Sequence, residues 1–151
     1  MASRTKRTAL LTLGCLILAF MGGYFWLYPS RGPKEDVNPN EKAYVEEIDG
    51  TTVLHLKGTP YEMGFQRGAL LKEKVHASAA GFEHLLDRAK EEVGLPKFAA
   101  KMIMALAYRL CEPHIPDRFL RELEGLADGS GVDLQLLRGA HVISVVTERG
   151  C

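Results

Sequence analysis

The chain has 151 residues with 19 basic and 19 acidic side chains, so its formal net charge is zero. That length allows one modest domain with an appendage. Residues 1–34 hold five basic residues and no acid, and no basic stripe follows them, which argues against nucleic-acid binding. The three cysteines, Cys15, Cys111 and Cys151, have the spacing of neither a disulfide framework nor a zinc site.

The first segment with a distinct character is an uncharged run at residues 9–28, preceded by a basic tail at residues 1–8. A helix of about twenty apolar residues is long enough to cross a bilayer, and basic residues favour the cytoplasmic side. The pattern predicts a transmembrane signal anchor that contacts membrane lipid. It also predicts a single-pass protein with a cytoplasmic N-terminus and with residues 29–151 outside the cytoplasm. A cleaved signal peptide is the alternative, and it would make the protein secreted.

Residues 29–43 contain three prolines and few apolar side chains, which predicts a linker. The two segments Tyr44–Ile48 and Thr51–Leu56 flank the dipeptide Asp49-Gly50. Asp-Gly favours a two-residue turn with positive φ at both positions, so this part predicts a β-hairpin.

A long helix is expected next, from Pro60 to Val93. Thr59 and Glu62 form a capping box, and Pro60 suits the first helical position. Small and apolar residues then recur at steps of three and four along one face. Gly64 and Gly68 lie one turn apart on that face, which predicts close approach of another backbone there.

Further helices are predicted at Lys97–Cys111, from Pro116 to Gly129, and near Asp133–Arg138, followed by a strand at His141–Val146. One hairpin and one strand leave sheet edges uncovered. The expected fold class is therefore α+β and incomplete: an N-terminal transmembrane helix, then a mostly helical region at residues 44–151 that lacks most of its sheet.

Two segments carry a family resemblance: LKGTPYEMGFQRGALL at residues 56–71, and IPDRFLRELEGLADGSGV at residues 115–132, followed by Gly150-Cys151. Together they resemble the acyl-CoA:6-aminopenicillanic-acid acyltransferase family and related autoproteolytic cysteine peptidases, which are N-terminal-nucleophile hydrolases. More loosely, they resemble phospholipase-B-like proteins. The resemblance implies that residues 44–151 are the pro-region or α-chain of an αββα sandwich, and that most of the sandwich, the β-chain, follows Cys151.

The resemblance also implies a chemistry at Gly150-Cys151. The precursor would cut itself between these residues, and Cys151 would become the catalytic nucleophile. A thiolate is a strong nucleophile, and a free α-amine with a pKa near 8 can serve as its base. The substrate would be a small-molecule amide or thioester, with a CoA thioester as a potential co-substrate and no bound cofactor or metal. Without the downstream residues that build an oxyanion hole, the 151-residue chain is expected to be inactive.

Two alternatives stay open. The chain could be a non-catalytic helical module, tethered to the membrane, that binds a partner, or it could belong to a phospholipase-B-like lipid amidase or esterase. The remaining polar residues have less specific patterns. His76 and His84 lack the four-residue spacing of a helical metal pair. Glu122, Glu124 and Asp128 are expected on the solvated face of their helix, and Cys111 in the core.

Overall fold

The computed structural model describes residues 18–19, 21–28, 31–37 and 43–147. The chain divides into two compact units, Met1–Ser30 and Arg31–Cys151.

In the first unit, residues 18–19 and 21–27 are helical. Within the described residues, no helix is both long enough and apolar enough to cross a membrane. This finding contradicts the predicted transmembrane helix at residues 9–28 and the predicted single-pass localisation, because a spanning helix needs about twenty consecutive apolar residues. Residues 9–17 of the predicted span, and the basic tail at residues 1–8, lie outside the described residues.

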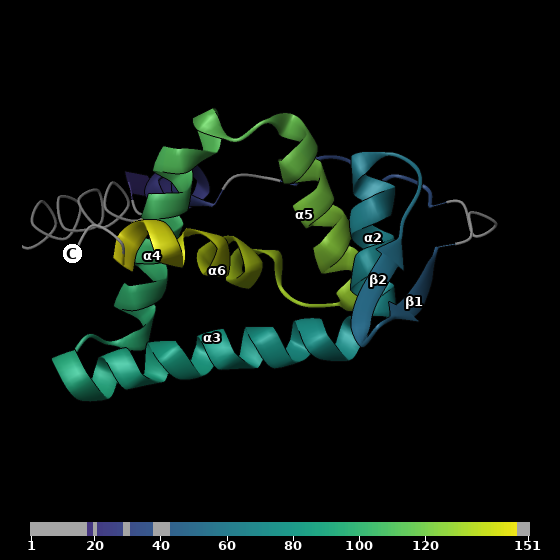
Figure 1. Cartoon of the computed structure of the whole chain (residues 1–151). Helices are drawn as coiled ribbons and strands as arrows, with labels where there is room; N and C mark the ends of the chain where they lie inside the picture. The colour runs from purple at the N-terminus through teal and green to yellow at the C-terminus, as the bar shows by residue number, and fades with distance from the viewer. Residues whose placement is uncertain (1–17, 20, 29–30, 38–42, 148–151) are drawn as a thin grey trace, which may run out of the picture. The chain divides into compact units, whose positions relative to one another are not determined.

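The elements of the second unit, in chain order, are β1 (Tyr44–Ile48), β2 (Thr51–His55), α2 (Pro60–Leu70), α3 (Lys72–Val93), α4 (Lys97–Cys111), the 3₁₀ turn η1 (Glu112–His114), α5 (Asp117–Ser130) and α6 (Leu134–Thr147) (Figure 1). Among the described residues the only sheet is a single antiparallel pair of short strands. The α+β class predicted from the sequence is therefore wrong for this part of the chain, which is mostly helical.

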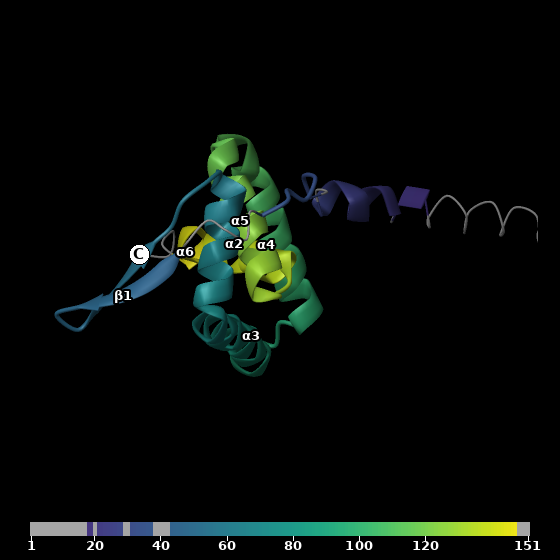
Figure 2. The ribbon, with the colours of Figure 1, turned by 90° about the vertical axis from the view of Figure 1, so that its right-hand side faces the viewer.

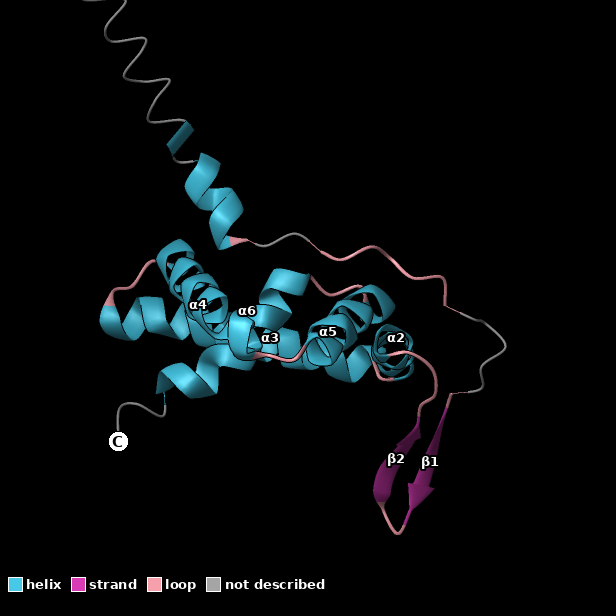
Figure 3. Ribbon diagram, turned by 90° about the horizontal axis from the view of Figure 1, so that it is seen from above, coloured by secondary structure: helices cyan, strands magenta, loops and turns pink. Residues whose placement is uncertain are grey.

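The predicted hairpin is confirmed. Its register pairs Tyr44 with His55 and Ile48 with Thr51, and both turn residues, Asp49 and Gly50, have positive φ, at 50° and 76°. Figure 3 shows the two strands extending away from the helices. The strands make their contacts with each other, so the hairpin contributes little to the helical core.

The predicted start of the long helix is also confirmed, but the helix is broken. Thr59 and Glu62 form both hydrogen bonds of the capping box, with Pro60 at the first position. At Leu71 the backbone leaves the helical region, with φ −111° and ψ 28°, and α3 continues in a different direction (Figure 1). The apolar periodicity continues through this break because α2 and α3 both bury one face: α2 packs mainly against α5, and α3 packs against α4, α5 and α6.

The core of the unit lies where α3, α4, α5 and α6 meet. Its buried residues are Ala79, Tyr108, Leu123, Leu126, Ala127, Val132, Leu134, Leu137 and Val142. A smaller apolar cluster, at the far end of α3, contains Phe82, Leu86 and Ala100.

The strand predicted at His141–Val146 is wrong, because these residues belong to helix α6. The β-branched residues there favour a strand, but strand propensity is readily overridden by tertiary packing. Leu134, Leu137 and Val142 are buried at helical spacing against the core, and this packing determines the structure of the segment.

Candidate functional site

Helix α6 ends at Thr147, and Gly150 and Cys151 lie outside the described residues. The structure therefore leaves the assignment of Cys151 as a prediction. The described features that could serve a function are the crossing of α2 and α5, a polar network beside it, and a pocket.

Helices α2 and α5 lie side by side with their backbones in close contact (Figure 2). An ideal Cβ on Gly64 would be 1.9 Å from the carbonyl oxygen of Glu122, and one on Gly68 would be 2.6 Å from that of Leu126. The close approach predicted from the two glycines is thus confirmed. It is possible because a glycine has no Cβ to hold the other backbone away.

The partner helix has the same arrangement. An ideal Cβ on Gly125 would be 2.0 Å from the carbonyl oxygen of Tyr61, and one on Gly129 would be 2.1 Å from that of Phe65. Each helix therefore presents two glycines, four residues apart, to the backbone of the other. We call this contact the glycine crossing. Its four glycines come from the two sequence segments that carry the family resemblance.

A short extended segment, residues 31–37, lies beside the crossing and is anchored to α5. The backbone N–H of Gly32 donates to the Glu124 carboxylate at 3.0 Å, and the Arg121 guanidinium donates to the Pro33 carbonyl at 2.7 Å. Arg121 also pairs with Glu35 at 2.5 Å. Part of the predicted linker at residues 29–43 is thus held against a helix, which its composition did not indicate.

Asp128 is the second anchor of this segment. It pairs with Arg31 at 2.5 Å and accepts a hydrogen bond of 2.8 Å from the hydroxyl of Tyr61 on α2. Burial raises the pKa of Asp128, but the hydrogen bonds from Tyr61 and Arg31 outweigh it, so the pKa lies below its usual value. Burial, together with the bond to Asp128, raises the pKa of Tyr61 to about 12. The Tyr61 hydroxyl therefore stays neutral and acts here as a donor.

Glu124 is almost fully buried, at 6% exposure. It pairs with Arg121 and lies 3.9 Å from the guanidinium of Arg138, which is itself buried on α6. The expectation that Glu124 and Asp128 lie on a solvated face is wrong, because Arg121 of the same helix and Arg138 of α6 cover Glu124, and Arg31 pairs with Asp128. Neither Arg121 nor Arg138 was predicted as a site residue, and no sequence motif identifies them.

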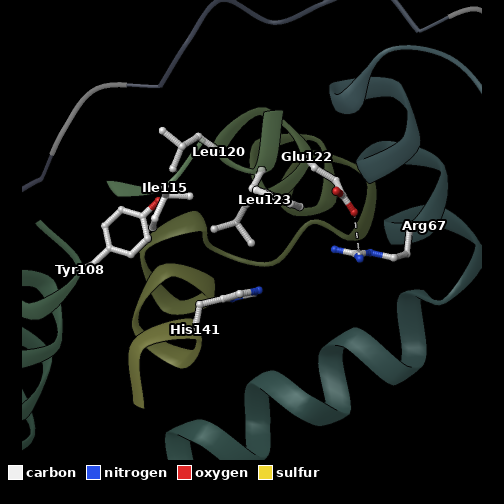
Figure 4. A pocket seen from close by; sticks show the side chains of 8 residues that line it. Arg67, Tyr108, Ile115, Leu120, Glu122, Leu123 and His141 are labelled. Carbon is white, nitrogen blue, oxygen red and sulfur yellow. Dashed lines mark ion pairs between the residues drawn. The ribbon is translucent and has the colours of Figure 1, made fainter. Parts of the chain in front are cut away.

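A pocket of about 330 Å³ opens among α2, α4, α5 and α6 (Figure 4). Its polar side carries Arg67 and Glu122, which pair at 3.0 Å, and the ring of His141 points toward them. The other side is apolar. The full lining consists of Arg67, Tyr108, Ile115, Phe119, Leu120, Glu122, Leu123 and His141.

The other residues singled out from the sequence do not form a catalytic cluster. Cys111 is half-buried at the end of α4. His76 donates through Nε2 to the carbonyl oxygen of Ser130, so it ties α3 to the end of α5. In the described part of the chain, no group of three or more histidine, cysteine or acidic residues is arranged to hold a metal ion.

Comparison with known proteins gives relatives of much greater length. The chain is 33% identical to "Protein dcd1B" of Dictyostelium discoideum over 121 residues, which cover 70% of this chain and 24% of that protein. It is 28% identical to an uncharacterized protein of Archaeoglobus fulgidus over 134 residues, covering 83% and 20%. "Protein dcd1A" of D. discoideum is 25% identical over 113 residues, covering 66% and 26%.

The chain thus spans about a fifth to a quarter of the length of these relatives. No family model and no solved structure matches it. The names of these relatives state no activity.

Proposed function

We propose that this chain is the N-terminal, helical part of a self-processing cysteine acyltransferase or amide hydrolase of the N-terminal-nucleophile type. In this proposal the described helices are a scaffold, and the chemistry takes place at Gly150-Cys151. The catalytic β-chain would follow Cys151, and the substrate would be a small-molecule amide or thioester, including a CoA thioester.

The observation that carries the proposal is the glycine crossing. The segments at residues 56–71 and 115–132 resemble the acyltransferase family, and the structure gives both a common structural role. A Cβ at any of the four glycines would meet a backbone atom of the other helix at 2.6 Å or less. The resemblance therefore rests on residues that are needed together, and not on two unrelated matches.

The proposed reaction has two stages. The Cys151 thiol attacks the Gly150 carbonyl and forms a thioester, and the peptide nitrogen leaves as the new α-amine of Cys151. Water then hydrolyses the thioester. In the processed enzyme the α-amine takes the proton of the Cys151 thiol, and the sulfur attacks the carbonyl of an amide or thioester. The amine or thiol of the substrate leaves with that proton, and the acyl group on sulfur then passes to water or to an amine, which regenerates the Cys151 thiol.

The test uses a longer protein that continues the natural reading frame beyond Cys151. We expect it to cut itself between Gly150 and Cys151, and mass spectrometry locates the new N-terminus to one residue. Cys151→Ala should stay intact because it lacks the attacking thiol. Cys111→Ala is the matched control, since it removes a half-buried cysteine elsewhere, and it should cleave normally. Cleavage that persists in Cys151→Ala would refute the proposal.

A second function, a non-catalytic helical module that binds a partner, is favoured by one observation. Helix α4 exposes Phe98, Met102, Leu106 and Leu110 at four-residue spacing, which we call the α4 stripe. Exposed apolar surface of this kind marks interaction sites. If the longer, folded protein never cleaves and neither transfers nor hydrolyses acyl groups, this second function is the better account.

A further inference from the structure

The pocket of Figure 4 has no role in the chemistry proposed for Cys151. Its volume of about 330 Å³ lies at the small end of the roughly 300–1,000 Å³ typical of small-molecule sites. Residues from α2, α4, α5 and α6 line it, together with Ile115 between η1 and α5. A site built from this many helices has a fixed shape, so its chemistry indicates the ligand that it fits.

The polar side of the pocket offers hydrogen-bond donors. A guanidinium has five N–H groups, and Arg67 forms an ion pair with Glu122 at 3.0 Å. The side chain of Arg67 is 35% exposed, so its remaining donors are accessible from the pocket. His141 donates through Nδ1 to the carbonyl oxygen of Leu137 at 2.8 Å, so Nε2 of the neutral ring is an acceptor, and the donors for a ligand come from Arg67.

The opposite side offers apolar surface. Ile115, Leu120 and Leu123 are among the lining residues on this side (Figure 4). Tyr108, which is 3% exposed, also lines the pocket. The guanidinium of Arg138 lies over the Tyr108 ring, 5.2 Å from its centre. This wall can therefore cover a short hydrocarbon chain.

We propose that this pocket binds a small carboxylic acid with an apolar chain, a ligand that the chemistry at Gly150-Cys151 does not require. The carboxylate accepts hydrogen bonds from Arg67, and the chain lies against Ile115, Leu120 and Leu123. Arginine suits this role because its planar fork of donors matches a carboxylate. Glu122 holds the guanidinium at the pocket and competes with the ligand for its donors. Arg67 is the one arginine or lysine in the lining, so the site fits a monoacid.

The experiment is a titration of the 151-residue chain with octanoate, in which calorimetry measures the affinity and amide NMR shifts locate the binding site. We expect saturable binding with the largest shifts at residues lining the pocket. Arg67→Gln should weaken binding at least tenfold. Arg88→Gln is the matched control, because Arg88 also pairs with a glutamate on a helix but lies on the exposed part of α3, and it should leave binding unchanged. Octylamine, which has the same chain with a cationic head, should bind at least tenfold more weakly than octanoate.

A second variant covers the case in which Arg67→Gln does not fold. Glu122→Gln keeps Arg67 and removes the competing carboxylate, so octanoate should bind more tightly. No saturable binding, equal affinity of octanoate and octylamine, unchanged affinity in Arg67→Gln, or weaker binding in Glu122→Gln would each overturn the proposal. None of these outcomes bears on self-cleavage, which is measured on the longer protein.

Discussion

The glycine crossing and the α4 stripe are two ways in which this chain uses a helix surface. At the crossing, four small residues bring two backbones into contact, and the polar groups beside it are paired. On α4, large apolar side chains face outward, with Phe98 and Leu110 at 69% and 63% exposure. Large apolar side chains are normally buried, because burial of each one contributes about 1.5–3 kcal/mol to the free energy of folding or binding.

The two surfaces differ in whether their packing partner lies within the second unit. The crossing finds its partner inside the second unit, so the described residues alone explain its sequence. The α4 stripe is exposed in the second unit, so packing among the described residues of this unit does not explain why these positions are apolar. A surface that covers them would lie outside the described part of this unit.

The largest expected effect is at the crossing. In Gly64→Ala the added methyl group would lie 1.9 Å from the backbone oxygen of Glu122, so the two helices must move apart. We expect a loss of about 3 kcal/mol in the free energy of unfolding, the upper end for overpacking. Gly81→Ala is the matched control, because Gly81 lies in α3 with nothing within 4 Å, and it should stabilise the protein by up to about 1 kcal/mol. Denaturant unfolding measures both, and equal effects would contradict the account of the crossing.

A smaller effect is expected from Tyr61→Phe, which keeps the ring and removes the hydrogen bond to Asp128. Bonds to charged groups contribute about 1.5–3 kcal/mol, so we expect a loss near 2 kcal/mol. The folded pKa of Tyr61, about 12, is raised above the unfolded value near 10. Its contribution is therefore fully present below about pH 10 and is lost as the pH rises toward about 12.

In Tyr61→Phe this alkaline loss should be absent. Thermal unfolding between pH 8 and pH 12 follows it, with Tyr44→Phe, a change on the exposed hairpin, as the control. A wild-type protein whose alkaline profile matches that of Tyr61→Phe would show that the Tyr61 hydroxyl contributes nothing.

Acid should weaken the anchoring of residues 31–37. Hydrogen bonds from Arg121 and then Thr59 lower the pKa of Glu35, and the pKa of Asp128 is also below its usual value. Both groups stabilise the fold above their unfolded pKa values, and that contribution is lost as the pH falls through the folded values. Unfolding measured from pH 7 down to pH 2 should show a decline that Glu35→Gln reduces. Stability that rises on acidification would contradict these ion pairs.

The smallest effect is expected on the α4 stripe. Leu110→Gln replaces an apolar side chain that is already 63% exposed, so the free energy of unfolding of the 151-residue chain should change by no more than about 0.5 kcal/mol. The same change should reduce binding of a hydrophobic dye, because it removes exposed apolar surface. A loss well above 1 kcal/mol would show that the stripe is already covered within this chain.

The sequence predicted the local features of the fold well. The turn at Asp49-Gly50, the capping box at Thr59 and the close approach at Gly64 are each determined by a few neighbouring residues or by the absence of a Cβ. Such features depend on local chemistry, so they can be recognised without knowing the tertiary structure.

Most of the predictions that were wrong concern features that depend on contacts between segments distant in the sequence. The break at Leu71 and the helix at His141–Val146 follow from which helices pack together, and neither changes the apolar periodicity that sequence analysis uses. The burial of Glu124 depends on α6, which brings Arg138 to within 3.9 Å of its carboxylate. At residues 9–28, apolar composition alone predicted a membrane helix that the described residues do not contain.

The most direct test of the central claim is the mass of the products formed by the longer protein that continues beyond Cys151. The account predicts two chains, one ending at Gly150 and the other beginning at Cys151 with a free α-amine, and a single intact chain for Cys151→Ala. A folded wild-type protein that remains one chain, or that is cut at another peptide bond, would contradict the assignment of Cys151 as the nucleophile.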